Sequence, residues 1–585
     1  MSGLCRHRRL IASDLRYACA MVPFDPNPFP LSSADESNSW TSQPVSEQFD
    51  RANKPLLQPN EAAPDDYYQN NFIEVFDFVL THHQSLLPTE LARAMNQFLL
   101  ADDDAQRLFA RLLTRKGPIF FDHTLDYREV SNAHKALDNL ADRRLILRCG
   151  PVPADGLLSQ LKKDDLLTLF SSSGPSQRAA PKDTVKNWIL GRYSDSRVCC
   201  MVAKYQPWCT VTEPSHWRLV QLLYFGSSGK DWSAHIRRDL GHIRYESVEL
   251  TKSRFPDRDS LLSYLDEREL QRRIYRLDEH PKLLPGLITA FNEPPNSPVA
   301  MRLRQRNLLR LGKWCERQQA WDDALRVFRN ATIPPARERQ VRILHKQGEL
   351  ERSQRLLADI AAQPLSATEH IFSQRFGRRG QGFQPPLTTW PIEETPEDVE
   401  RYVLEALTAQ GGWGVHSENT LVKTLTGLMY WEAVFAPEPG AFTNPFQMGP
   451  HDLMEHEFAA QRSQLLAQIE AQTDSELTEH LLAISQTKCG IANPLVNWRM
   501  LEAIPVQQWL DALPLHWIRQ LSHFLIRNLA DYRKGFPDLF VVHPDGTPEL
   551  VEVKGPSDQL QPQQRAWFEV LAKLDIRARV IKLKR

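Results

Sequence analysis

Residues 533–567 read RKGFPDLFVVHPDGTPELVEVKGPSDQLQPQQRAW, and this stretch predicts a β-hairpin followed by a helix. Two runs rich in strand-favouring residues, DLFVV and ELVEVK, flank a short polar loop. In that loop Pro544 and Asp545 suit a type I turn, and Gly546 suits the left-handed residue that follows it. The sequence therefore predicts a three-residue hairpin loop with a bulge at its glycine.

The loop also predicts the register of the two strands. If His543 and Thr547 flank the loop, counting outward places Asp538 directly opposite Glu552. Opposed residues of an antiparallel pair share a face, with Cβ atoms about 4.5–5.5 Å apart. Lys554, two residues beyond Glu552, points to the same face. Two carboxylates and one ammonium group are therefore expected to converge.

This convergence suits a metal-dependent nuclease. Two adjacent carboxylates repel each other and raise one pKa unless a cation lies between them. Mg²⁺ is a hard cation that prefers oxygen ligands, so it fits this pair. The alternative is a surface hairpin whose acids and lysine have no catalytic role. A helix carrying Gln564 and Trp567, and a third strand at 576–583, complete the strand, hairpin, helix and strand order of PD-(D/E)XK nucleases.

Two segments of the chain resemble the VRR-NUC domain of the Fanconi-associated nuclease family, within the PD-(D/E)XK superfamily. One is the run GFPDLFVV with LVEVKGPSDQLQPQQRAWFEVL, and the other is the upstream run HSENTLVKTLTGLMYWEAVF. Eukaryotic members of that family carry an N-terminal ubiquitin-binding zinc finger. No such cysteine pattern occurs here, so the resemblance implies a bacterial-type member.

The resemblance implies a role for each residue of the site. The implied ligands of two metal ions, Mg²⁺ or Mn²⁺, are Asp538, Glu552, the carbonyl of Val553 and Glu418. Asp538 is expected to bridge the two ions, and Glu418 to reach the second ion from just before a helix. Lys554 is expected to orient or activate the attacking water. Gln564, the fourth implied catalytic residue, is expected to steady the hairpin or a phosphate.

The implied activity is that of a structure-specific DNA nuclease. It comprises 5′ flap endonuclease and 5′-to-3′ exonuclease action of the phosphodiesterase I type, by a two-metal mechanism. The implied substrate is branched or flapped double-stranded DNA, and the implied process is interstrand crosslink repair. Two alternatives stay open, a junction-binding repair protein without catalysis and a Holliday-junction resolvase. The intact acid–acid–lysine set disfavours the first, and the long N-terminal portion disfavours the second.

The 585 residues predict a multidomain protein, mainly α-helical with a C-terminal α/β PD-(D/E)XK nuclease core. The predicted parts are a flexible N-terminal arm (1–70), a helical DNA-binding region with a winged helix as one interpretation (71–156), a SAP-type module (157–192), the rest of the DNA-binding region (193–295), tetratricopeptide-like helices (296–375) and a nuclease domain (396–585, with its VRR-NUC part at 473–585). Three local expectations accompany them: a short strand pair ending 72–150, a helix, loop and helix over 157–192, and a strand at 245–250.

Net charge is −1, so the whole chain does not indicate nucleic-acid binding. The stretch 302–342, however, holds ten Arg and one Lys against four acidic residues. That excess suits a phosphate-contacting surface, and the alternative is a set of solvated helix faces. The candidate DNA contacts are Lys162, Lys163 and Lys182 in the SAP-type module, and Arg337, Arg339 and Arg342 in the tetratricopeptide-like helices.

Cysteine usage and hydropathy exclude other classes. The eight cysteines include no CxxC pair, which disfavours a structural zinc site and predicts free thiols in a reducing compartment. No apolar run of about 18 residues occurs, so no membrane span is expected. The predicted location is the cytoplasm, on the nucleoid during repair. The sequence indicates no particular protein partner.

Overall fold

The computed structural model describes residues 66–115, 117–170, 179–226, 243–250, 253–378, 382–444 and 446–585. Except for its last five residues, the arm predicted for 1–70 lies outside these ranges. The chain divides into two units, Met1–His242 and Ile243–Arg585. Within the described ranges no helix is long and apolar enough to cross a membrane. The cysteines of these ranges are free thiols.

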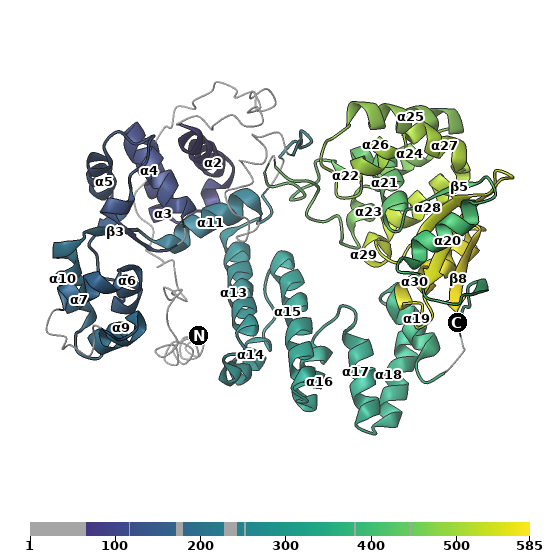
Figure 1. Ribbon diagram of the computed structural model, residues 1–585, viewed down its shortest axis with the longest axis horizontal. Coiled ribbons are helices and arrows are strands. Elements are labelled where there is room, and N and C mark those ends of the chain that lie inside the picture. The colour runs from purple at the N-terminus through teal and green to yellow at the C-terminus, as the bar shows by residue number, and fades with distance from the viewer. Residues whose placement is uncertain are drawn as a thin grey trace. The chain divides into compact units, whose positions relative to one another are not determined.

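The first unit begins with helices that pack on an aromatic core (Figure 1). Asp102 accepts a hydrogen bond from the Ala105 N–H at 2.9 Å, which caps α4 as the acidic start of that run predicts. Phe76 stacks on Trp217 with ring centroids 5.5 Å apart, so the first helix packs against the last. The helices are α2 (Tyr67–His83), η2 (Gln84–Leu86), α3 (Thr89–Leu99), α4 (Asp103–Thr114), η3 (Asp122–Thr124), α5 (Ala133–Asp142) and α11 (Pro214–Phe225).

A small antiparallel sheet joins these helices to the next module. Its order is β1-β3-β2, with β1 at Ile119–Phe121, β3 at Trp208–Val211 and β2 at Ile146–Arg148. The sequence predicts two strands that pair with each other at the end of 72–150. Both strands are present, but the predicted pairing between them is wrong. β1 and β2 each pair with β3, which the chain supplies only after the following helical module.

That module consists of α6 (Ala154–Gln160), α7 (Lys163–Leu169), α9 (Lys182–Leu190) and α10 (Asp195–Tyr205). The single helix expected before the loop is two helices. Leu161 is extended (ψ 152°), and Asp165 accepts a hydrogen bond from the Lys162 N–H at 3.0 Å to begin the second. Leu157, Val185 and Val198 share one buried core, which holds the module together. The loop at 171–178 lies outside the described residues.

The second unit starts with helices that stand side by side as antiparallel pairs, α15 with α16 and α17 with α18 (Figure 1). A Cβ added at Gly312 would lie 2.5 Å from the Phe328 ring, so glycine there lets α15 and α16 approach closely. The helices are α13 (Arg258–Tyr275), η4 (Pro281–Leu283), α14 (Leu284–Ala290), α15 (Pro298–Arg317), α16 (Trp321–Arg329), α17 (Ala336–Lys346), α18 (Leu350–Ala362) and α19 (Ala367–Arg375).

The strand expected at 245–250 was wrong, because the described residues there form no strand. Arg244 alone makes a parallel bridge, to Ile491. Glu246 instead accepts hydrogen bonds from the Trp431 indole N–H at 2.8 Å and from Lys488 at 3.0 Å. This segment is thus held by side chains against the helices of the C-terminal region, and not by a sheet.

The C-terminal region is built on a five-stranded mixed sheet. Its order is β4 (Leu387–Pro391), β8 (Ala578–Lys584), β7 (Pro548–Lys554), β6 (Leu539–Val542) and β5 (Trp413–His416). β4 and β7 run parallel to β8, whereas β6 is antiparallel to both β7 and β5. β8 confirms the strand expected at 576–583, and α30 (Pro562–Lys573) confirms the helix before it.

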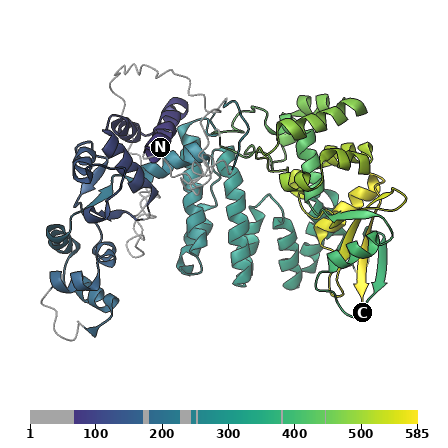
Figure 2. The same cartoon turned by 45° about the horizontal axis from the view of Figure 1, so that its top comes forward.

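Helices cover both faces of this sheet (Figure 2). On one face Val403 of α20 (Val399–Thr408) packs with Val541 and Ile581. On the other, α21 (Thr420–Met429), α28 (Leu515–Arg527) and α30 share a core with Phe540 and Leu550. The remaining helices of this region are α22 (Trp431–Val434), α23 (Phe458–Gln461), α24 (Ser463–Glu470), α25 (Asp474–Thr487), α26 (Trp498–Ala503), α27 (Val506–Ala512) and α29 (Leu529–Tyr532).

Candidate active site

The β6–β7 hairpin has the predicted turn and register. The His543 N–H donates to the Thr547 carbonyl at 2.9 Å, and the Gly546 N–H donates to the His543 carbonyl at 2.8 Å. Gly546 has φ 82°, a conformation that glycine adopts without strain. Leu539 pairs with Val551, so the next position outward sets Asp538 opposite Glu552. The predicted juxtaposition of the two acids is confirmed.

Asp538 lies where β5, β6 and β7 meet. Its Oδ2 accepts a hydrogen bond from the Val553 N–H at 2.9 Å. Its own carbonyl accepts from the N–H groups of Ser417 and Glu418, at 2.8 and 2.9 Å. Backbone contacts therefore bring the Glu418 segment beside Asp538, although the two are far apart in the sequence.

Glu552 is fully buried, and its two carboxylate oxygens have different surroundings. Lys554 Nζ lies 2.5 Å from Oε1, and Gln564 Nε2 also donates to Oε1. Oε2 is buried and has no hydrogen-bond partner among the described residues. Oε1 thus accepts from two side-chain donors, whereas Oε2 has no hydrogen-bond partner among the described residues.

Burial dominates the electrostatics of this pair. It raises the pKa of Glu552 to about 8, and the adjacent Asp538 carboxylate adds to that rise. Burial likewise raises the pKa of Asp538, against the hydrogen bond from Val553. A buried, unpaired acceptor beside a second carboxylate is unfavourable unless a cation or a proton compensates it. The donor set is all oxygen, so the pair fits a hard divalent cation.

Glu418 is placed beside the pair only in part. Its backbone is bonded to Asp538, but its carboxylate is exposed and accepts a 2.8 Å hydrogen bond from Asn419. No three His, Cys, Asp or Glu side chains in the described ranges are grouped closely enough to hold a metal ion. The carboxylate that the resemblance assigns to a second ion is therefore near Asp538, but among the described residues it is not grouped with the other two acids.

Three further residues of the site escaped sequence reasoning. His416 Nε2 lies 2.6 Å from a Glu400 carboxylate oxygen, and Glu400 contributes to the raised pKa of Asp538. Asn419 links Glu418 to the loop before Asp538. The signal for His416 and Asn419 was their position within the run HSENTL, directly around Glu418. No sequence signal indicates Glu400, which lies in the first turn of α20.

The Lys candidates of the SAP-type module have different environments. Lys182 is half-buried, and its ammonium donates to the Ser159 carbonyl at 2.6 Å. Lys162 is exposed at the start of α7, and Lys163 follows it on that helix. Of the three candidates, Lys162 and Lys163 therefore lie together at the start of α7, whereas Lys182 lies at the start of α9.

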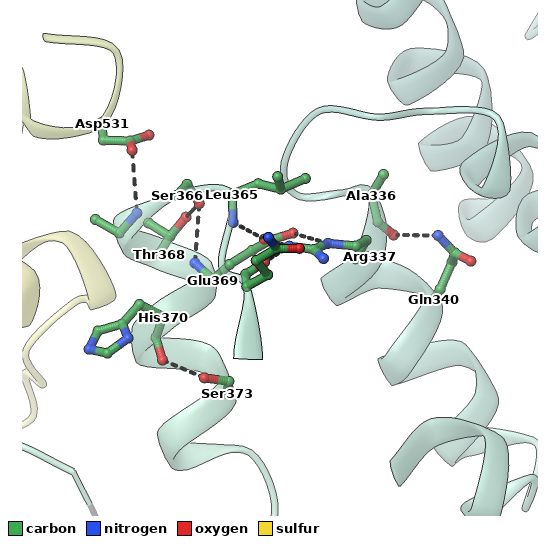
Figure 3. Close-up of polar contacts among 12 residues, drawn as sticks. Ala336, Arg337, Gln340, Leu365, Ser366, Thr368, Glu369, His370, Ser373 and Asp531 are labelled. Atoms are coloured by element: carbon green, nitrogen blue, oxygen red, sulfur yellow. Dashed lines mark hydrogen bonds and ion pairs between the residues drawn. The ribbon is translucent and has the colours of Figure 1, made fainter. Parts of the chain in front are cut away.

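The three Arg candidates are tied to acids. Figure 3 shows the Arg337 guanidinium facing the Glu369 carboxylate, and their Nη2 and Oε2 atoms lie 2.5 Å apart. Glu369 is fully buried, so this pair joins α17 to α19. Arg339 pairs with Glu316 at 3.3 Å, and Arg342 pairs with Glu338 at 2.9 Å. Each of the three guanidinium groups therefore has a different acidic partner within the protein.

A basic groove lies instead between α15 and α17. Its volume is about 780 Å³, and its rim carries one acid against six cations. Arg310 Nη1 and Arg339 Nε are buried and have no hydrogen-bond partner among the described residues. The cations are Arg306, Arg310, Lys313, Arg317, Arg339 and Lys346. Its lining therefore has an excess of positive charge, although Arg339 is paired with Glu316.

Comparison with known proteins extends these observations. Residues 472–584 match the VRR-NUC domain, and residues 66–147 match the HTH domain of FAN1. The Fanconi-associated nuclease 1 homolog of Pseudomonas aeruginosa is 28% identical over 88% of this chain and 95% of its own length. The rice homolog is 27% identical over 88% of this chain, which spans 62% of the rice protein.

A solved structure agrees in fold over most of the chain. It is a crystal structure of paFAN1 bound to 5′ flap DNA with a two-nucleotide flap and a gap. It superposes with a TM-score of 0.80 and 27% identity, over 90% of this chain and 99% of the other. A second structure, with a one-nucleotide flap, gives a TM-score of 0.77. This chain is therefore similar to Fanconi-associated nucleases over most of its length, with a matched VRR-NUC domain and a matched FAN1 HTH domain.

Proposed function

We propose that this chain is a structure-specific DNA nuclease that hydrolyses phosphodiester bonds at 5′ flaps during DNA repair. One observation carries the proposal. Asp538, Glu552 and Lys554 converge on the hairpin of a VRR-NUC domain, and a buried Glu552 oxygen is left without a partner. The similar paFAN1 chain is described in complex with 5′ flap DNA. We extend the proposal to 5′-to-3′ exonuclease action and to interstrand crosslink repair on the bacterial nucleoid.

The VRR-NUC nuclease family is metal-dependent. We assign two Mg²⁺ or Mn²⁺ ions to this site, which Asp538, Glu552, the Val553 carbonyl and Glu418 would hold. When bound, such ions generate a nucleophilic water and neutralise charge on the phosphate. The unpaired Glu552 oxygen and the two opposed acids support this assignment.

The protein's own groups prepare the site. The Val553 N–H holds one oxygen of Asp538 at 2.9 Å, so its carboxylate has a defined orientation. Gln564 donates to Oε1 of Glu552, which keeps Oε2 turned away from that donor. The Lys554 side chain is 14% exposed, and its ammonium lies 2.5 Å from Glu552 Oε1. We assign Lys554 to orienting the attacking water, since an ammonium has three donors.

Gly535 fixes the approach to Asp538. It has φ 90°, and a Cβ there would lie 2.8 Å from the backbone carbon of Gln563. Only glycine fits this conformation and this close approach without strain. The start of α30, which carries Gln564, is thereby packed against the loop that leads to Asp538.

We assign DNA binding to three upstream parts. Residues 66–147 match an HTH domain. The other two parts are the segment 157–192, which we propose to be a SAP-type module, and the helices α15 to α18, which we propose to be tetratricopeptide-like. The α15–α17 groove is proposed to contact the DNA backbone, since its lining holds six cations against one acid and two buried guanidinium N–H groups in it have no hydrogen-bond partner among the described residues. Lys162 and Lys163 are proposed to add phosphate contacts in the SAP-type module, with Lys182 anchoring it.

The test is a cleavage assay on end-labelled DNA with Mn²⁺ or Mg²⁺. We expect cutting of a 5′ flap, weaker action on a blunt duplex, and none in EDTA. A four-way junction in the same assay separates a flap nuclease from a resolvase. Absence of metal-dependent cutting on every substrate, with DNA binding retained, would favour a junction-binding protein and overturn the nuclease proposal.

Metal binding is expected to release protons. Because the pKa of Glu552 is raised to about 8, the metal-free protein retains this proton at pH 7, and a cation displaces it. We expect release of about one proton per site at pH 7, falling toward zero above pH 9. Affinity for Mn²⁺ should accordingly rise with pH and level off above the Glu552 pKa. Calorimetry in buffers of different ionisation enthalpy measures this, and a heat independent of buffer contradicts it.

The groove is tested by charge reversal. Lys313→Glu with Lys346→Glu places two acids on opposite sides of the groove, and both lysines are exposed. We expect flap DNA to bind on the order of 10-fold more weakly, with a smaller salt dependence. Arg326→Glu with Arg329→Glu, exposed on α16 and outside the groove lining, makes the same charge change as a control. Equal loss in both double variants, measured by fluorescence anisotropy, would contradict a groove-specific contact.

A further inference from the structure

Asn419 occupies the residue before α21, where asparagine usually accepts a hydrogen bond from the first turn of a helix. Here its side chain makes no such cap. Its Nδ2 donates to Glu418 Oε1 at 2.8 Å, and its Oδ1 accepts from the Phe536 N–H at 3.1 Å. The side chain is therefore used to join two segments that lie 117 residues apart.

Both ends of this link belong to the candidate site. Phe536 lies two residues before Asp538, in the loop that Gly535 turns into β6. Glu418 donates its own N–H to the Asp538 carbonyl at 2.9 Å. The Glu418 segment is thus tied to the Asp538 segment at two points, once through the backbone and once through the Asn419 side chain.

Glu418 needs such support. Its φ is 25°, a left-handed conformation that a residue with a Cβ rarely adopts unless its surroundings hold it there. Its carboxylate is exposed, and among the described residues Asn419 provides its only hydrogen bond. A free Glu side chain loses rotamer freedom when it binds a ligand, whereas one held in advance loses less.

We propose that Asn419 is a positioning residue that restrains the Glu418 carboxylate beside the metal site without binding the metal itself. The inference rests on the proposed nuclease function, since it assumes that Glu418 is a metal ligand. The competing explanation is that Asn419 only fastens the loop at Phe536. The two explanations make different predictions, because only a positioning role requires the Glu418 side chain to be present.

A double-mutant cycle on metal affinity separates them. Asn419→Ala is expected to weaken Mn²⁺ binding on the order of 10-fold, measured by calorimetry on the full chain without DNA. In a Glu418→Ala background the same substitution is expected to have no further effect. Asn419→Ser provides a second variant, because serine caps α21 in a conventional way but is too short to reach Phe536.

Matched controls and a second readout complete the design. Asn497, which accepts a 3.3 Å hydrogen bond from the Met500 N–H, caps α26, and Asn497→Ala should leave Mn²⁺ affinity unchanged. In flap cleavage, Asn419→Ala should raise the Mn²⁺ concentration for half-maximal rate and leave the rate at saturation nearly unchanged.

Three results decide the matter. Native Mn²⁺ affinity in Asn419→Ala and Asn419→Ser overturns the proposal. An equal loss in the native and Glu418→Ala backgrounds also overturns it, in favour of a loop-fastening role. Native protein that takes up no Mn²⁺ and cuts no flap contradicts the nuclease site as a whole, which is a different failure from that of Asn419 alone.

Discussion

Asp538→Asn is expected to lower 5′ flap cleavage at saturating metal by at least on the order of 10³-fold. The amide keeps the size of the carboxylate, and its oxygen still accepts the Val553 N–H bond of 2.9 Å. What it removes is the negative charge assigned to both metal ions. Cleavage of end-labelled flap DNA under single-turnover conditions measures the loss without interference from product release.

The same substitution is expected not to destabilise the metal-free protein. Burial and the neighbouring acids raise the pKa of Asp538, so its charge is unfavourable in the folded state without a cation. Asparagine removes that cost, and the melting temperature in EDTA should equal or exceed that of the native protein. Loss of activity together with a lower melting temperature would point to misfolding and not to the chemistry.

Asp545→Asn is the matched control on the same hairpin. Asp545 is in the turn, and its carboxylate accepts a 2.9 Å hydrogen bond from the Thr547 N–H, a role that asparagine also fulfils. Its cleavage rate should stay within about two-fold of native, since the turn lies outside the ligand set. If Asp538→Asn cuts as fast as Asp545→Asn, the site has been assigned to the wrong residues.

The hairpin was predictable because its determinants are local. Pro544, Asp545 and Gly546 define the loop, and a strand pair has only one register once its loop is known. The opposition of Asp538 and Glu552 follows from counting along that register. The partners of Glu552 were less accessible, since the contact with Gln564 depends on how α30 returns over the sheet.

Contacts between distant segments were not predictable in the same way. The hydrogen bond that the Phe536 N–H donates to the Asn419 side chain requires the β5–β6 pairing, which no local pattern specifies. β3 lies between β1 and β2 for a similar reason, because the strand that completes the sheet follows the helical module that runs from α6 to α10. The helix is interrupted at Leu161, where Asp165 caps the start of the next helix. The apolar residues on either side keep a helical spacing, so the sequence pattern predicts one continuous helix.

The charge count of 302–342 shows a further limit of sequence alone. Arg304 contributes to that basic excess, yet it is 6% exposed and pairs with Glu267, which is 1% exposed. Its Nη2 and Nε lie 2.6 and 2.8 Å from Glu267 Oε1, and Nη1 donates to the Glu293 carbonyl at 2.6 Å. A residue counted in that basic excess is therefore part of the packing between α13 and α15. Burial, and not the count of charges, separates structural arginines from those of the groove.

Arg304→Met is accordingly expected to destabilise the folded protein by about 3–5 kcal/mol, because it leaves the Glu267 carboxylate buried without its cation. The Asn307 side chain, 3.2 Å from Glu267 Oε2, is then the remaining side-chain donor to that carboxylate among the described residues. Adding Glu267→Gln should recover a large part of the loss, since a neutral amide costs less to bury than an unpaired charge. The melting temperature and the rate of proteolysis between α13 and α15 measure both variants.

The control for the Arg304–Glu267 pair is an exposed ion pair on α13, the helix that carries Glu267. Arg272→Met removes an exposed partner of Glu269, a pair at 3.1 Å with the arginine side chain 47% exposed, and should cost less than about 1 kcal/mol. Comparing the two variants tests whether the loss of folding stability depends on the burial of the ion pair or only on its presence. Equal melting of Arg304→Met and Arg272→Met would mean that Glu267 becomes protonated or hydrated without its partner. In that case the buried pair would contribute little to the α13–α15 junction, and the apolar contacts of Leu308 and Leu311 would carry its stability.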